Sequence, residues 1–160
     1  SAQDANTSGC TVLIPSEDML FSSALSSPAK PRGMSRDITT REVKEASVPS
    51  YNGMYVKSLA LATAVIKEFC TFTGAQPLGI VSLSDQTGFN YSDSPVIAIE
   101  MGCLSNEADD IRLNRAAYQD ACAFGVYRGI NQYAAMIESG DFDIASLLES
   151  YNNSKSTKEK

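Results

Sequence analysis

Residues 95–106, PVIAIEMGCLSN, carry a continuous apolar run directly into a polar turn. An apolar run without alternating polar residues is typical of a strand that is covered on both faces, as in the centre of an α/β sheet. The run ends at Glu100, and Asn106 followed by Asp109 three residues later predicts the capped start of a short helix. A central strand is therefore expected to lead into a helix through a turn that carries a glutamate.

Two further strands and a long helix are expected before this stretch. Residues 10–14, CTVLI, are apolar and largely β-branched before Pro15, and residues 78–83 form a second apolar run. A helix is predicted from Tyr55 to a left-handed cap at Gly74, because apolar residues recur there at helical spacing. Its apolar stripe consists of Leu59, Thr63, Ile66, Cys70 and Thr73.

A second long helix is predicted over about residues 115–137. Its apolar stripe consists of Tyr118, Cys122, Val126, Ile130, Tyr133 and Ile137. Ala121, Gly125 and Gly129 form a row of small residues beside that stripe, which we expect to let the helix pack close to a sheet. Together these elements predict the α/β class, with a mixed, mainly parallel sheet flanked by helices.

The chain divides by composition into one domain and a tail. Residues 1–140 are expected to form the domain, with 16–52, rich in Ser and Pro, as a long loop or insertion that contains a short helix near 40–46. Such a loop is either functional or disordered. Residues 141–160 are expected to form a short helix and a polar tail or linker.

The composition is that of an acidic chain of 160 residues, long enough to bury a core of its own. Lysine and arginine number 13 against 19 acidic residues, which argues against a nucleic-acid-binding protein because such proteins present a basic face. No apolar run approaches the ~20 residues of a membrane span, and no basic and then apolar leader opens the sequence. We therefore expect no nucleic acid partner, no membrane span and no signal peptide in these residues.

Histidine is absent from the sequence, which excludes Ser-His-Asp and Cys-His triads and histidine-bearing zinc sites within these residues. The four cysteines, at positions 10, 70, 103 and 122, match neither a C-x-x-C metal motif nor a dense disulfide framework. We expect them to be small buried residues, with one or two disulfides as the alternative in an exported protein.

Glu100 is the one acidic residue that directly follows a buried apolar run. Open α/β sheets bind ligands at the carboxyl ends of their strands, and a carboxylate that loses hydration there suits general acid and base chemistry. Glu100 is therefore the candidate catalytic residue. The alternative is a glutamate that caps the next helix or binds a backbone amide, and position alone does not separate the two.

Three segments carry a resemblance to a known family. Residues 95–110 fit the pattern P-x-x-x-x-E-[MLT]-G-[FY]-[LMI]-[ST]-N-x-x-[DE]-[DE] except at Cys103. Residues 69–74, FCTFTG, precede this motif, and residues 118–133, with Tyr-Gln, Gly-Ile and Tyr at helical spacing, follow it. These segments resemble the C-terminal half of zinc-dependent N-acetylmuramoyl-L-alanine amidases of the amidase 3 class of cell-wall hydrolases.

The resemblance implies an amidase/phosphorylase-hydrolase-like fold and hydrolysis of the amide between the muramoyl lactyl group and L-alanine by zinc-activated water. Glu100 matches the family's catalytic glutamate, which would take a proton from the water and give one to the leaving amine. Gly102, Ser105 and Asn106 match positions that would shape the site and aim Glu100. The partner would be peptidoglycan or a muropeptide, and the location would be secreted or in the cell envelope.

The chain departs from the family at the metal, because the family's zinc ligands are two histidines and a glutamate. Gln3 falls at the position of a lost histidine in a loose alignment, and Gln is a weak zinc ligand. We therefore expect this chain alone to bind no zinc and to show no amidase activity. Either the N-terminal strands and ligands lie upstream, or the chain is a relative that has lost the metal. The alternative function is a non-catalytic amidase-like module that binds peptidoglycan or a protein partner.

Overall fold

The computed structural model describes residues 6–16, 53–84, 86, 88–89, 92, 94–140, 143 and 146. The predicted loop at 16–52, with its helix near 40–46, lies outside these residues apart from Ser16. The predicted helix and tail at 141–160 lie outside them apart from residues 143 and 146. The elements are β1 (Cys10–Pro15), α2 (Gly53–Thr73), β2 (Pro77–Leu83), β3 (Ala98–Glu100), α3 (Glu107–Leu113) and α4 (Ala116–Ser139).

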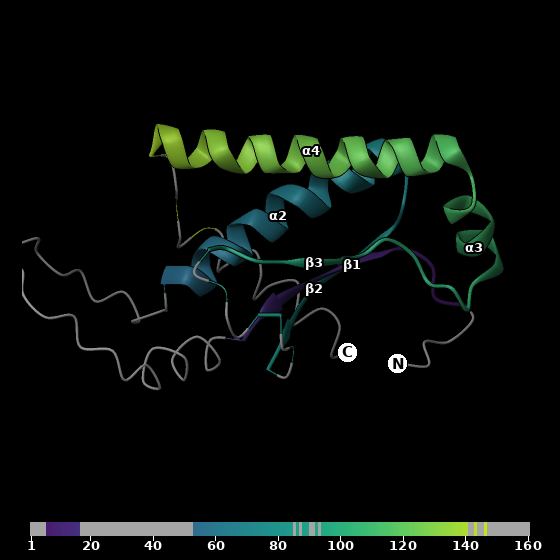
Figure 1. Cartoon of the computed structure of the whole chain (residues 1–160), viewed down its shortest axis with the longest axis horizontal. Coiled ribbons are helices and arrows are strands. Elements are labelled where there is room, and N and C mark those ends of the chain that lie inside the picture. The colour runs from purple at the N-terminus through teal and green to yellow at the C-terminus, as the bar shows by residue number, and fades with distance from the viewer. Residues whose placement is uncertain are drawn as a thin grey trace, which may run out of the picture.

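The strands of the described residues form one mixed sheet in the order β2-β1-β3 (Figure 1). β1 runs parallel to β2 along its whole length and antiparallel to β3 over Thr11 to Leu13. The central strand is β1, whose Val12 and Ile14 side chains are fully buried, as its β-branched sequence predicts. The predicted fold class, a mixed and mainly parallel sheet flanked by helices, is confirmed.

The prediction of a central strand over residues 95–99 is wrong for the described residues, because β3 is a short strand at the sheet edge. The backbone N–H of Val96 donates a hydrogen bond of 3.1 Å to the Ser58 hydroxyl of α2 instead of to a strand. Ile97 and Ile99 pack against the core. Residues 95–99 are therefore apolar because they face the core beside α2. A continuous apolar run is found both in such a segment and in a central strand, so the sequence pattern does not distinguish the two.

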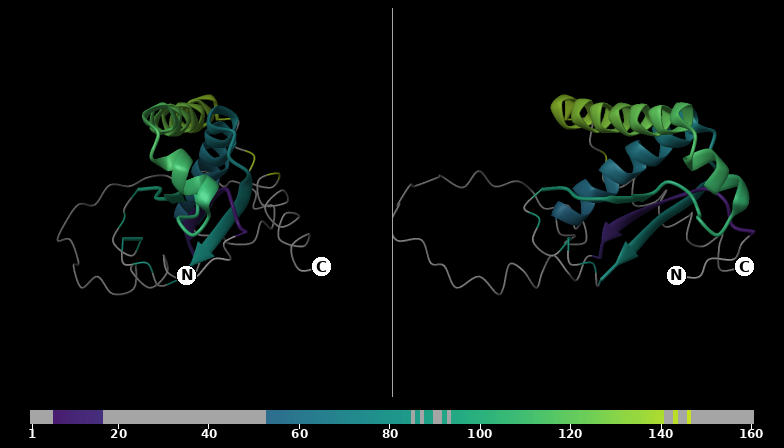
Figure 2. Two further views of the ribbon diagram at one scale, coloured as in Figure 1. Left: turned by 90° about the vertical axis from the view of Figure 1, so that its right-hand side faces the viewer. Right: turned by 45° about the vertical axis from the view of Figure 1, so that its right-hand side comes forward.

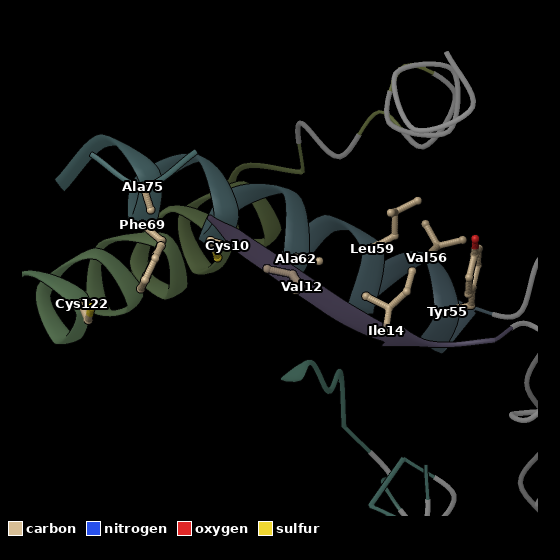
Figure 3. Packing of buried hydrophobic residues seen from close by; sticks show 10 residues of the cluster. All are labelled: Cys10, Val12, Ile14, Tyr55, Val56, Leu59, Ala62, Phe69, Ala75 and Cys122. Atoms are coloured by element: carbon tan, nitrogen blue, oxygen red, sulfur yellow. The ribbon is translucent and has the colours of Figure 1, made fainter. Parts of the chain in front are cut away.

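The helices form two layers over the sheet, and α2 lies between the sheet and α4 (Figures 1 and 2). Because α2 packs on both sides, small buried residues such as Ala62 alternate along it with large ones such as Leu59 and Phe69. The core cluster joins side chains of β1, α2 and α4 (Figure 3). α2 ends as predicted, since Gly74 after its last residue adopts the left-handed conformation with φ 68°.

The small residues of α4 allow a close approach to another helix, so the prediction that they face a sheet is wrong. A Cβ added at Gly129 would lie 2.5 Å from the Cα of Val65, and one added at Gly125 would lie 2.8 Å from the Cα of Phe69. Both partners belong to α2. Ile130, which the predicted apolar stripe includes, is exposed. No helix in the described ranges is long and apolar enough to cross a bilayer.

Candidate functional site

Glu100 is the last residue of β3, and it pairs with Thr11 near the start of β1. Because β3 is antiparallel to β1, Glu100 lies at the end of the sheet where β1 and β2 begin, with Cys10 paired to Pro77. The parallel strands β1 and β2 therefore have their amino ends, and not their carboxyl ends, beside Glu100. Glu100 is at a carboxyl end only of its own strand.

The Glu100 side chain is exposed, so the loss of hydration expected from the sequence is not found. The described residues provide no hydrogen bond or ion pair to its carboxylate. The alternative prediction for Glu100 is that it caps a helix or accepts a hydrogen bond from a backbone amide. Among the described residues no such donor contacts its carboxylate. Its carboxylate is open to groups from outside these residues.

Asn106 is the N-cap of α3, as the sequence predicts. Its side-chain oxygen accepts hydrogen bonds from the backbone N–H groups of Ala108, at 3.0 Å, and Asp109, at 3.2 Å. The other half of the predicted capping box is wrong, because the Asn106 N–H donates to the carbonyl of Cys103 and not to Asp109. Ser105 is exposed in the same turn.

Gly102 packs against the side chains of α3. A Cβ at this position would lie 3.2 Å from Cδ1 of Leu113 and 3.4 Å from the Asp109 side chain. The turn after Glu100 therefore lies close to α3, and a side chain at residue 102 would require Leu113 to shift. Gly102, Ser105 and Asn106 all lie between Glu100 and α3, and their predicted role in aiming Glu100 remains a prediction.

Asp109 is the residue that sequence reasoning missed. The residue is 3% exposed, and its carboxylate accepts hydrogen bonds from the Ser8 hydroxyl at 2.7 Å and from the N–H groups of Gly9 and Cys103 at 3.0 Å each. It also forms an ion pair with Arg112. Its sequence signal, an acidic residue in the first turn of a helix, predicts a cap and says nothing about burial.

The hydrogen bonds keep Asp109 ionised. Burial by itself raises the pKa of this carboxyl, but the donors from Cys103, Ser8 and Gly9, together with the charge of Arg112, outweigh burial and hold the pKa below its ordinary value. Arg112 in turn donates to the Ser8 hydroxyl at 3.0 Å. The carboxylate is therefore a structural anion that is fully surrounded by donors.

The cysteines are free thiols, and Cys10, Cys103 and Cys122 are buried, as the sequence predicts. Burial is the main cause that raises the pKa of Cys10 to about 12, and the neighbouring Cys70 and Cys122 thiols add to it. Because the thiolate is the nucleophile and metal ligand, a thiol with this pKa is inert near neutral pH.

A cavity of about 630 Å³ lies between the β3–α3 connection and α4. Its lining is mainly apolar and consists of Met101, Leu113, Gln119, Cys122, Ala123 and Val126. The Gln119 amide donates a hydrogen bond to the Leu113 carbonyl. The described residues that line this cavity include no carboxylate, and their one ionisable group is the Cys122 thiol.

The family model for N-acetylmuramoyl-L-alanine amidase, Amidase_3, matches residues 1–132. The chain belongs to this amidase family. The matched residues include Glu100, Gly102, Ser105 and Asn106, and also the buried Asp109. The predicted resemblance is confirmed, and no curated protein gives a significant match.

Solved amidase structures share the fold at low sequence identity. The CwlD amidase of Clostridioides difficile, in complex with the GerS lipoprotein, is 17% identical with a TM-score of 0.57, over 85% of this chain and 51% of that one. CwlV of Bacillus (Paenibacillus) polymyxa var. colistinus is 17% identical with a TM-score of 0.54, over 84% and 52%. Ami1 of Mycobacterium smegmatis is 17% identical with a TM-score of 0.56, over 82% and 49%. The chain spans about half the length of these amidases.

The residues present do not fit the zinc site that the resemblance implies. The sequence has no histidine, and within the described ranges no three His, Cys, Asp or Glu residues are grouped so that they could hold a metal ion. Gln3, the residue predicted at a lost ligand position, lies outside the described residues.

Proposed function

We propose that this chain serves peptidoglycan hydrolysis as the Glu100-bearing part of an N-acetylmuramoyl-L-alanine amidase. The observation that carries the proposal is the placement of Glu100 within the family match. It is exposed at a strand end, next to a turn whose sequence follows the family pattern. The bond attacked is the amide between the muramoyl lactyl group and L-alanine in peptidoglycan, at the cell envelope.

Glu100 would act as the general base and then as the general acid. Its carboxylate accepts a proton from the attacking water while the water oxygen bonds to the carbonyl carbon. When the carbon–nitrogen bond breaks, the same proton goes to the leaving amine, which gives a lactyl carboxylate and a free L-alanine amino group. An exposed carboxylate without partners among the described residues is accessible to water and substrate alike.

Hydrolysis in this family also requires a metal that activates the water, and the described residues of this histidine-free chain provide no group of ligands for one. We therefore expect the 160-residue chain alone to release no stem peptide from a purified muropeptide. Fusion of the histidine-bearing N-terminal half of a family member ahead of Ser1, together with Gln3→His to restore the second histidine ligand, should produce release that mass spectrometry detects. Glu100→Gln should abolish that release, whereas Glu107→Gln, a matched change at an exposed glutamate of α3, should preserve it.

The second candidate function is a non-catalytic module that holds peptidoglycan, and the absence of histidine favours it. Co-sedimentation of the chain with insoluble peptidoglycan distinguishes the two. Binding that is unchanged by Glu100→Gln, together with an inactive fusion, supports the module. If the chain does not bind peptidoglycan and the fusion does not hydrolyse it, both proposed functions are overturned.

A further inference from the structure

We propose that Asp109 is the positioning residue of this site, because its buried carboxylate fixes the backbone on both sides of the Thr11–Glu100 strand pair and so sets where Glu100 stands. The inference takes the catalytic role of Glu100 from the proposed function. The fixation itself is a property of the fold and can be measured without activity.

The Asp109 carboxylate binds the backbone just beyond the end of the β1–β3 pairing. Thr11 and Glu100 form the outermost pair of the β1–β3 ladder, and beyond it the chain continues to Gly9 on one side and to Cys103 on the other. Oδ2 of Asp109 accepts the N–H groups of both Gly9 and Cys103 at 3.0 Å. A single side-chain oxygen thus joins the two segments where strand pairing has ended.

The carboxylate cannot turn away. Its other oxygen, Oδ1, accepts the Ser8 hydroxyl at 2.7 Å and the guanidinium of Arg112. Arg112 also donates to Ser8 at 3.0 Å, so the three side chains hold one another. Because Asp109 is 3% exposed, water does not compete for these bonds, and charge-assisted bonds of this kind are the strong ones.

Two glycines, Gly9 and Gly102, lie in the segments that the carboxylate joins, and each packs closely against its neighbours. A Cβ at Gly9, which has φ 139°, would lie 2.2 Å from the Gln76 carbonyl oxygen. A Cβ at Gly102 would lie 3.4 Å from Oδ2 of Asp109. Gly9 thus has no room for a side chain because it packs against the backbone before β2, and Gly102 has little because it packs against Leu113 and the Asp109 carboxylate.

These contacts matter for Glu100 because its own carboxylate has no partner among the described residues. Its place then depends on the backbone that carries it, and that backbone is fixed at Cys103 and, through the paired strand, at Gly9. Substitution of Asp109 should free the segment around Glu100 first, while the β1–β2 pairing, which has no contact with the carboxylate, should keep its protection.

The test is amide hydrogen exchange by NMR on the isotope-labelled 160-residue chain. In Asp109→Asn, exchange at Gly9 and over residues 100–103 should quicken by more than about tenfold, while exchange at Ile14, which pairs with Ser82 of β2 and lies outside the β1–β3 register, should stay within about twofold. The Glu100 carboxyl ¹³C signal should move in the same variant. Asp110→Asn removes the same charge from the exposed neighbouring position and should change neither readout.

A second variant covers the case in which Asp109→Asn does not fold. Ser8→Ala removes one donor to Oδ1 and leaves Gly9, Cys103 and Arg112 in place, so it should give a smaller change at the same amides. Uniform faster exchange throughout the sheet, or no difference between the Asp109 and Asp110 variants, would show that Asp109 only stabilises the fold. An inactive fusion with unchanged exchange results would reject the proposed function and leave this inference standing.

Discussion

Gly129 of α4 lies against Val65 of α2 so closely that a Cβ on the glycine would be 2.5 Å from the Cα of the valine. The contact is between two backbones, so no rotamer change can relieve an added side chain. The approach of the two long helices therefore depends on the absence of a side chain at this position.

Gly129→Ala should destabilise the chain by about 1–3 kcal/mol, because overpacking at a backbone contact forces α4 away from α2. The measurement is the free energy of unfolding in urea at pH 7. Gly88→Ala is the matched control, because a Cβ at Gly88 meets nothing within 4 Å, and it should cost less than about 0.5 kcal/mol. Equal losses in the two variants would contradict the helix contact.

Asp109→Asn should lower the free energy of unfolding by about 3 kcal/mol at pH 7, because it leaves Arg112 and buried donors without their anion. The folded-state pKa of Asp109 lies below the ordinary value of 3.8, so its stabilisation is fully present above pH 3.8. It is lost as the pH falls through the folded-state pKa. Unfolding curves between pH 7 and pH 2 should therefore show wild type and variant converging in acid, and a constant gap would contradict this linkage.

Ser58→Ala should destabilise the chain by about 1–3 kcal/mol, because the buried hydroxyl accepts the N–H of Val96 that no strand receives. Hydrogen exchange at Val96 should quicken in this variant, while the β1–β2 amides keep their rates. Ser92→Ala, which removes a hydroxyl from a local turn contact to Ser94, serves as the control. Unchanged exchange at Val96 would show that another group satisfies this N–H.

Cys10 should resist alkylation in the native chain at pH 8, because its thiol is fully buried and its pKa is raised to about 12. Iodoacetamide followed by mass spectrometry should label Cys10 only after denaturation, when all four cysteines of the chain react. Modification of Cys10 at the rate of the denatured chain would contradict its burial.

Zinc should leave the melting temperature of the 160-residue chain unchanged, because the sequence lacks histidine and the described part lacks a three-ligand cluster. Thermal unfolding with Zn²⁺ and with EDTA makes the comparison. A rise with Zn²⁺ that EDTA reverses would reveal ligands outside the described residues.

The positions of elements followed from local chemistry, and so they could be predicted. The spacing of apolar residues placed α2 and α4 within two residues of their observed ends, and Gly74 and Asn106 marked helix ends by conformation and capping. The family motif around Glu100 was likewise visible in the residues themselves. Each of these signals lies within a few residues along the chain.

What the sequence did not reveal were relationships between distant residues. β3 is an edge strand because no further described strand pairs with it, and Val96 just before it donates its N–H to Ser58 of α2. The burial of Asp109 depends on Ser8 and Gly9, which come from the start of the chain. Gly125 and Gly129 of α4 pack against α2 and not against the sheet, because α2 lies between the sheet and α4.

The sequence by itself thus determined the elements, the amidase motif with Glu100, and the lack of histidine, since each is a matter of local pattern or composition. The tertiary structure alone decided that Glu100 is exposed at the end where β1 begins and that Asp109 is the buried anion beside it. The physical reason is that strand direction and burial are set by which segments pack together, and the same local sequence is compatible with more than one such arrangement.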